Sequence, residues 1–149
     1  MSVNPDFRDL FAALNDAHAE FLIVGGYAMA LHGYPRFTKD LDVWIKANVE
    51  NAHKVWEALD QFGAPFGDLT IQDLSSLGIV FQMGLPPNRI DIITSIDGVE
   101  FAEAWEHSIS SAYGDQPVTV IGIDELIHNK ETTGRPQDVL DAITLRKSQ

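Results

Sequence analysis

The pattern of hydrophobic and polar positions predicts alternating helices and strands in the first third of the chain. Asn4-Pro5 is a suitable N-cap and first-turn pair, and apolar residues then recur at helical spacing: Phe7, Leu10, Phe11 and Leu14. Residues 21–24 form a short continuous apolar run, which is typical of a buried strand. The glycine pair Gly25-Gly26 ends this run and precedes a helical stretch that stops at Gly33.

The rest of the chain continues this mixed pattern. The expected strands are 41–45, 78–83, 89–96 and 118–121, and the expected helices are 49–62, 101–107, 124–130 and 135–145. A Gly/Pro-rich connection separates 78–83 from 89–96, so we expect an antiparallel pair there. No internal repeat interrupts this order. We therefore expect an α+β fold, a mixed sheet flanked by helices, in a single domain over residues 1–149.

Composition excludes several classes of protein. The hydrophobic fraction of 45% and charged fraction of 21% are those of a globular chain. The absence of cysteine excludes disulfide scaffolds, cysteine-ligated zinc and a thiol nucleophile. No apolar run approaches the roughly 18 residues of a membrane span, so we expect a cytoplasmic protein without membrane contact. The net charge of -12 makes binding of nucleic acid over the whole surface the weakest of the functional readings.

Three aspartates stand on predicted strands. Asp40 and Asp42 are two residues apart, and because side chains alternate along a strand, both carboxylates leave the same face. Asp91 is flanked by isoleucines and leaves an otherwise apolar strand in the same way. Solvent-facing or edge-protecting aspartates would give the same pattern. Trp44 shares the face of Asp40 and Asp42, and packing against a helix is favoured over a contact with a bound base.

Carboxylates that converge repel one another, and a cation relieves this repulsion. Hard oxygen ligands select Mg²⁺ or Mn²⁺. Two such ions about 3.5 to 4 Å apart are typical of in-line phosphoryl or nucleotidyl displacement. Gly25-Gly26 lies between a strand and a helix, where backbone N–H groups can approach an anion such as a triphosphate. A glycine pair alone is more often a plain turn.

The stretch from Val24 to Val43, VGGYAMALHGYPRFTKDLDV, resembles the signature of the DNA-polymerase-β-like nucleotidyltransferase superfamily. In particular it resembles the small bacterial branch related to abortive-infection toxins, because Arg36, Thr38 and Asp40 match the basic-Thr-Asp form of that branch. The resemblance implies that Gly25 and Gly26 contact the triphosphate of an NTP. It also implies three metal-binding and catalytic carboxylates: Asp40, Asp42 and Asp91.

The resemblance extends toward the C-terminus. Residues 130–138, KETTGRPQD, are similar to the Lys-then-Arg-Pro-x-Asp segment of the same branch, which implies that Lys130 neutralises triphosphate charge. A lysine at a helix C-terminus and an aspartate, Asp138, at a helix N-terminus would also be favourable without any ligand. Many members of the superfamily have Ser where Gly26 stands, so this chain has only backbone donors at that position.

The leading functional hypothesis is transfer of an NMP from an NTP to an acceptor hydroxyl with release of pyrophosphate. The acceptor is left open among a small molecule, a tRNA end and a protein side chain. We expect acceptor specificity to depend on the loop 62–77, on a second copy of the chain in a homo-oligomer, or on a partner protein such as an antitoxin. The alternative is a non-catalytic nucleotide-binding or toxin-antitoxin partner module that retains the fold.

Overall fold

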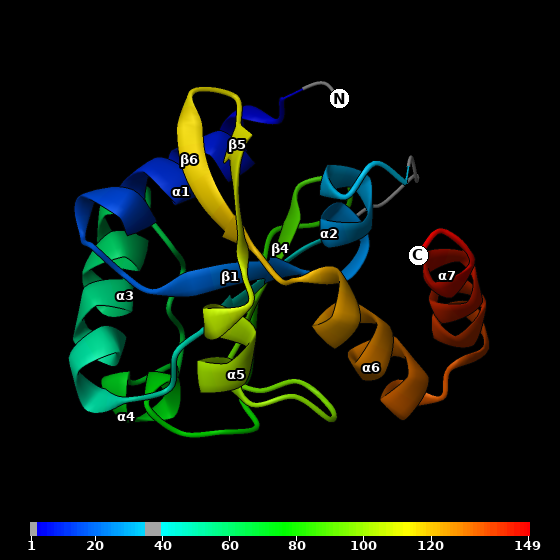
Figure 1. Ribbon diagram of the computed structural model, residues 1–149. Coiled ribbons are helices and arrows are strands. Elements are labelled where there is room, and N and C mark those ends of the chain that lie inside the picture. Colours follow the sequence, from blue (N-terminus) through cyan, green and yellow to red (C-terminus); the bar gives the residue numbers. More distant parts are fainter. Residues whose placement is uncertain (1–2, 35–39) are drawn as a thin grey trace.

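The computed structural model describes residues 3–34 and 40–149, so Arg36 and Thr38 lie outside the described residues. The elements, in chain order (Figure 1), are α1 (Pro5–Asp16), β1 (Phe21–Val24), α2 (Gly25–Leu31), β2 (Asp40–Ile45), α3 (Val49–Phe62), α4 (Ile71–Leu74), β3 (Val80–Met83), β4 (Arg89–Ile93), α5 (Phe101–Glu106), β5 (Ile109–Tyr113), β6 (Gln116–Val120), α6 (Ile123–Thr133) and α7 (Pro136–Lys147). Within these described ranges, no helix combines the length and apolar character needed to cross a bilayer.

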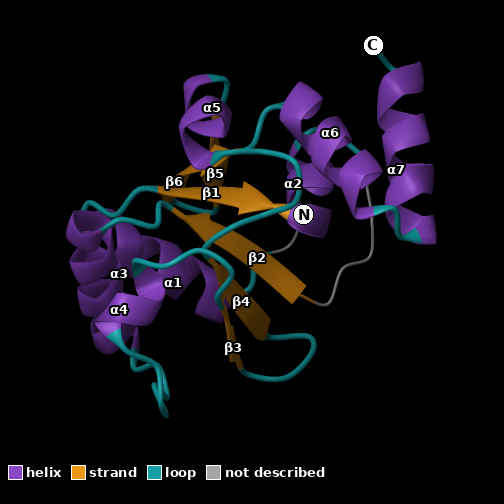
Figure 2. Cartoon of the chain, turned by 90° about the horizontal axis from the view of Figure 1, so that it is seen from below, coloured by secondary structure: helices purple, strands orange, loops and turns teal. Residues whose placement is uncertain are grey.

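The strands form one mixed sheet in the order β3-β4-β2-β1-β6-β5. β1 pairs antiparallel with β2 and parallel with β6, whereas β2 runs parallel with β4. Antiparallel pairs, β3 with β4 and β5 with β6, complete the two edges. Helices α1, α3 and α4 lie on one side of the sheet and α6 and α7 on the other (Figures 1 and 2). The predicted α+β class is confirmed.

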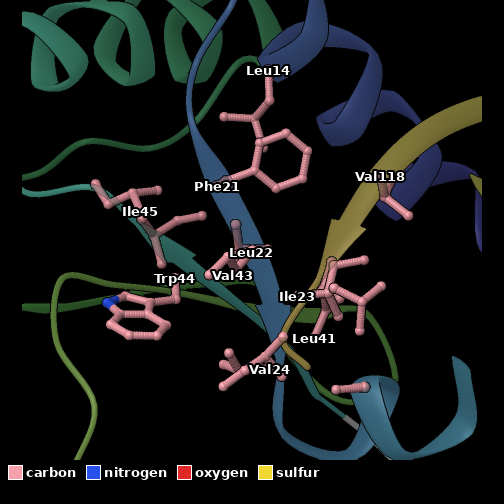
Figure 3. Close-up of a cluster of buried hydrophobic side chains, with 14 of the residues drawn as sticks. Leu14, Phe21, Leu22, Ile23, Val24, Leu41, Val43, Trp44, Ile45 and Val118 are labelled. Atoms are coloured by element: carbon pink, nitrogen blue, oxygen red, sulfur yellow. The ribbon is translucent and has the colours of Figure 1, made fainter. Parts of the chain in front are cut away.

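The main core lies between the sheet and helices α1 and α3. The Asn4 side chain caps α1 by accepting hydrogen bonds from the first backbone N–H groups, which leaves the apolar stripe of the helix facing inward. Phe11 on this stripe stacks on Phe21 of β1 with ring centroids 5.8 Å apart. Leu41 and Val43 of β2 are fully buried in the same apolar cluster, part of which is drawn in Figure 3. The core therefore fixes one face of β2 and leaves its other face available.

Most predicted elements are present, and the exceptions have local causes. β1 and α3 have the predicted bounds, and the predicted antiparallel pair is found as β3 and β4 with shorter strands. α4 and β5 were not predicted. α4 is a single turn held by a capping box between Thr70 and Asp73, and β5 is an edge strand whose half-polar sequence ISSAY carries no clear apolar period. α6 begins one residue before Asp124 and continues to Thr133.

Candidate active site

Strands β2 and β4 bring the three predicted aspartates to one region of the sheet. The parallel register pairs Asp42 with Asp91 and Asp40 with Arg89. Because neighbouring strands lie about 5 Å apart, directly paired residues project side by side from the same face. Leu41 and Val43, which alternate with the aspartates along β2, face the core. The strand register that pairs these apolar residues with β4 on one face therefore also pairs the carboxylates on the other face.

The environment of Asp42 disfavours its charged form. Burial raises the pKa of Asp42 to about 7, and the nearby charges of Asp91 and Asp40 raise it in the same direction. The charges of Arg89 and Arg135 oppose this rise without cancelling it. A carboxyl group with such a pKa gains from a cation placed beside it, because the cation stabilises the ionised form.

Arg89 supplies positive charge to this face of the sheet. Its guanidinium donates from Nε to Asp91 Oδ1 and from Nη2 to Asp91 Oδ2, both at 3.1 Å, and its Nε lies 3.9 Å from Asp40 Oδ1. This is a bidentate pair in which one arginine bridges two of the three aspartates. Arg89 was not predicted as a site residue, although its position two residues before Asp91 on the same strand places it on the same face.

Gly25 allows the chain to pass close to Asp42. Its φ of +69° lies in the left-handed region, and a Cβ at this position would clash with Asp42 Oδ2. Gly25 and Gly26 form the first residues of α2, whose N-cap residue Val24 provides no side-chain cap. The glycine pair is therefore part of the helix start, and the N-cap residue offers no side-chain acceptor to the first backbone N–H groups.

The carboxylates line one wall of a cleft of about 400 Å³. The other wall comes from α6 and the start of α7, and it contributes five polar side chains, Asn129, Lys130, Thr133, Arg135 and Asp138. The cleft thus lies between the free face of β2 and β4 and the C-terminal helix pair. Its lining contains acidic, basic and amide groups, which suits a charged ligand.

Lys130 is buried between two carboxylates. Its side chain is 6% exposed, and Nζ lies 2.9 Å from Asp141 Oδ2 and 3.3 Å from Asp138 Oδ1. Burial alone would raise the pKa of Asp138, but hydrogen bonds from Thr133 and Arg135 and the charge of Lys130 bring it below its usual range. Lys130 therefore joins α6 to α7, which goes beyond the simple helix-end role considered from sequence.

Arg135 is the exposed cation at the cleft. Its side chain is 75% exposed, and its Nε donates to Asp138 Oδ2 at 2.7 Å. Its charge reaches Asp42, whose pKa it lowers. The sequence places Arg135 in the Arg-Pro segment without assigning it a role in the site, and the structure brings it into the lining of the cleft at the turn between α6 and α7.

The predicted packing role of Trp44 is seen in the structure. The indole is 1% exposed and lies edge-on against Phe101 of α5, with ring centroids 5.1 Å apart. Along the site face of β2, the side chains therefore change from carboxylates at Asp40 and Asp42 to a buried aromatic ring at Trp44. The polar part of the face ends where α5 covers it.

The carboxylate oxygens of the cleft suit a hard divalent cation, although they do not converge as the ligands of a bound metal ion do. Across the described ranges, no three acidic, histidine or cysteine side chains converge closely enough to hold a metal ion. Arg89 bridges Asp91 and Asp40 in this arrangement. All the candidate ligands are carboxylate oxygens, and the pKa of Asp42 is raised by burial first and then by the charges of Asp91 and Asp40, so a cation beside it would favour the ionised form.

No protein-family model matches the sequence, and no curated protein matches it. Several solved structures match the fold, among them the following two. One is a candidate nucleotidyltransferase from Thermotoga maritima, with a TM-score of 0.60 and 14% identity over 98% of this chain and 94% of that chain. The other is ANT(2″)-Ia in complex with adenylyl-2″-tobramycin, with a TM-score of 0.59 and 17% identity over 93% of this chain and 84% of that chain. The chain has a nucleotidyltransferase fold.

The nucleotidyltransferase fold accounts for the arrangement of the sheet and of the helices around the cleft. Both matches cover nearly the whole of this chain, so the likeness includes the C-terminal helices as well as the strands that carry the aspartates. The resemblance deduced from the sequence is confirmed at the level of fold. Membership of the abortive-infection branch stays a prediction.

Replacing Asp42 by Asn should stabilise the metal-free protein in a pH-dependent way. The folded chain binds the Asp42 proton more tightly than the unfolded chain, so its free energy of unfolding falls as the pH rises from about 4 to about 7. Asn cannot ionise, so the gain in the free energy of unfolding caused by Asp42→Asn should be roughly 2 kcal/mol larger at pH 8 than at pH 5. Urea unfolding with a chelator present measures this. Asp68→Asn, in an exposed loop, serves as the control. Equal effects of Asp42→Asn at the two pH values would contradict the prediction.

Replacing Lys130 by Ala should destabilise the fold. The change leaves Asp138 and Asp141 buried without the ammonium between them, which costs about 3 to 5 kcal/mol. The matched control is Lys54→Ala, which removes an exposed helical ion pair with Glu50 and should cost less than about 1 kcal/mol. Thermal or urea unfolding compares the two. A Lys130 variant as stable as the Lys54 variant would show that the buried cluster does not hold α6 to α7.

Proposed function

We propose that the chain is a divalent-metal-dependent nucleotidyltransferase that moves an NMP from an NTP to an acceptor hydroxyl. The observation that carries this is the direct pairing of Asp42 with Asp91 on parallel strands, inside a cleft of a nucleotidyltransferase fold. Such a pair is costly to maintain for stability alone, because each carboxylate raises the free energy of the ionised form of the other. A carboxylate pair of this kind inside a cleft is typical of a functional site.

The reaction is a single displacement at phosphorus. The acceptor oxygen forms a bond to the α-phosphorus, the bond from that phosphorus to the bridging oxygen breaks, and pyrophosphate leaves with the bonding electrons. The proton of the acceptor hydroxyl passes to a carboxylate, and Asp91 is the candidate because it is the aspartate outside β2. Mg²⁺ or Mn²⁺, held by Asp40, Asp42 and Asp91, would supply positive charge to the phosphates and the attacking oxygen.

Other groups of the protein would contact the negatively charged phosphates or orient the carboxylates. Gly25 and Gly26 offer backbone N–H groups to the triphosphate at the start of α2. Arg135 faces the cleft with an exposed guanidinium and is better placed than Lys130 to reach a phosphate, because Lys130 is occupied by two carboxylates. Arg89 holds Asp91 by two hydrogen bonds and so fixes the orientation of this carboxylate toward the cleft.

A second candidate function is a non-catalytic nucleotide-binding or toxin-antitoxin partner module. The observation that favours it is the bridge of Arg89 between Asp91 and Asp40, which satisfies part of the acidic cluster without a metal ion. Such a module would bind an NTP through Arg135 and backbone groups with little dependence on Mg²⁺. Metal dependence therefore separates the two functions.

Wild-type protein should bind an NTP only with Mg²⁺ present, and the double change Asp40→Asn and Asp42→Asn should abolish that binding. The reason is that removing both β2 carboxylates removes most of the candidate metal ligands. Calorimetric titration with each of the four NTPs, with Mg²⁺ or with a chelator, measures the effect. The matched control is Asp60→Asn with Asp68→Asn, which neutralises two exposed aspartates and so makes the same change in net charge.

The outcomes distinguish the two candidates. Metal-dependent binding that the control variant retains and the site variant loses supports the enzyme. Tight NTP binding that is indifferent to Mg²⁺, with no pyrophosphate released over any acceptor tried, supports the non-catalytic module. Absence of binding by wild-type protein under every condition contradicts both functions for this chain.

Replacing Arg135 by Ala should weaken NTP binding without unfolding the protein. A charge-assisted contact to phosphate contributes about 1.5 to 3 kcal/mol, so the Kd should rise about ten- to a hundredfold. The control is Arg146→Ala, because Arg146 is also exposed and paired with one carboxylate, Glu131. Calorimetry in the presence of Mg²⁺ compares the variants. Equal loss of affinity in both would indicate a non-specific effect of charge and would remove Arg135 from the site.

A further inference from the structure

A second cavity adjoins the carboxylate cleft. It has a volume of about 600 Å³, and Ser95 and Ile96 line both the cavity and the cleft. These two residues follow shortly after β4, the strand that carries Asp91. The cavity therefore borders the cleft beyond the end of the strand that carries Asp91.

The walls of this cavity are mainly apolar. They include Trp44, Leu77, Ile96, Val99 and Phe101. Phe101 meets Trp44 edge-on with ring centroids 5.1 Å apart, so two aromatic rings form part of the wall, and Trp105 stacks on Phe101 with ring centroids 5.7 Å apart. The volume lies within the range of about 300 to 1,000 Å³ that is usual for small-molecule sites. The lining also includes Lys46 and Glu100, but it is more apolar than that of the carboxylate cleft, and its apolar part suits an uncharged ring.

One polar atom in these walls lacks a partner. Trp44 is 1% exposed, and its Nε1–H has no hydrogen-bond acceptor among the residues that the structure describes. Figure 3 shows this nitrogen on the side of the indole that points away from β1. A buried donor without an acceptor costs about 1 to 3 kcal/mol, so an acceptor atom brought by a ligand would be favoured.

We propose that this cavity, named the Trp44 cavity, binds the acceptor substrate and that the acceptor is a small aromatic alcohol or phenol. Its flat ring packs among the apolar walls, a carbonyl or ether oxygen accepts from the Trp44 indole, and its hydroxyl extends toward Asp91. Trp44 is two residues beyond Asp42 on β2, and Asp42 pairs with Asp91, so the backbone of Trp44 lies about 7 Å along the strand from this pair, a separation similar to the length of one substituted ring. This inference rests on the proposed nucleotidyl transfer and gives the class of its acceptor.

A nucleobase has related chemistry, but the geometry favours the acceptor. The candidate triphosphate contacts, Gly25 and Arg135, come from α2 and from the turn between α6 and α7. The Trp44 cavity instead connects through Ser95 and Ile96 to the strand of Asp91. A molecule in this cavity therefore borders the cleft at residues that follow Asp91, whereas neither Gly25 nor Arg135 lines the cavity.

Binding of 4-hydroxybenzamide, which has a ring, a carbonyl and a hydroxyl, tests the Trp44 cavity directly. The chain has three tryptophans, so the indole N–H signal of Trp44 in a ¹⁵N-correlated NMR spectrum is assigned by loss of the other two in Trp56→Phe and Trp105→Phe. Titration without NTP or metal should shift the Trp44 signal saturably. myo-Inositol, which has hydroxyls but no aromatic ring, should leave it unchanged.

Two exposed leucines provide a matched pair of variants. Leu77 lines the cavity and is 75% exposed, whereas Leu85 is 80% exposed and lies on a different surface. Leu77→Asp should weaken 4-hydroxybenzamide binding roughly fivefold, because it removes part of the apolar wall. Leu85→Asp should not change it. No shift of the Trp44 signal, or equal weakening by both variants, would overturn the proposal.

A paramagnetic measurement tests whether the cavity serves the active site. Mn²⁺ bound at the aspartates should broaden the ring signals of bound 4-hydroxybenzamide, and the variant with Asp40→Asn and Asp42→Asn should lose the broadening while still binding the probe. Probe binding unaffected by Mn²⁺ that is shown to bind at these aspartates would overturn the acceptor role. Displacement of the probe by adenosine would identify a nucleobase pocket and would also overturn it. If the protein binds no metal or NTP, the proposed nucleotidyl transfer fails, even if the Trp44 signal still reports probe binding.

Discussion

The repulsion among carboxylates on β2 and β4 is the constraint on which the rest of the site depends. Parallel pairing places Asp42 directly beside Asp91, and burial makes the ionised pair more costly. The chain relieves this cost in part through Arg89, which forms two hydrogen bonds to Asp91 and approaches Asp40. The pKa of Asp42 stays raised, because burial and the charges of Asp91 and Asp40 together outweigh the opposing charges of Arg89 and Arg135. A cation bound beside these carboxylates would stabilise their ionised forms, so the cluster favours a positively charged ligand.

Much of this arrangement could be predicted because strand alternation is strict. The spacing of Asp40 and Asp42 required a shared face, and the apolar residues between them required the opposite face to be core. The sequence could not show that β4 pairs with β2 in parallel and in this register, because strand order depends on contacts between distant segments. The bridging role of Arg89 depends on that register, so it could not be predicted. The edge strand β5 was missed because an edge strand with one solvent face needs few apolar residues.

The two cations near the cleft show why residue type alone does not assign a role. Lys130 and Arg135 belong to the same short segment, and both are paired with Asp138. The lysine lies inside the junction of α6 and α7, where its charge balances two buried carboxylates, while the arginine stays exposed at the turn. A buried ion pair must remain intact to avoid an uncompensated charge, so Lys130 cannot leave its partners at low cost. Arg135 can exchange its surface partner for a ligand, because exposed pairs contribute little to stability.

The site face of β2 has two parts, which suit different chemical groups of the substrates. Asp40 and Asp42 form its charged part, and Trp44, next in the same alternation, begins an aromatic part that α5 covers. Charged and apolar ligand groups are therefore separated along one rigid strand. A strand positions such groups more accurately than a flexible loop. If the acceptor lies against Trp44 and the triphosphate beside Asp42, their relative placement is set by β2 itself. The helices then need only close around the two ligands, which explains how a single small domain could bring an NTP and an acceptor together.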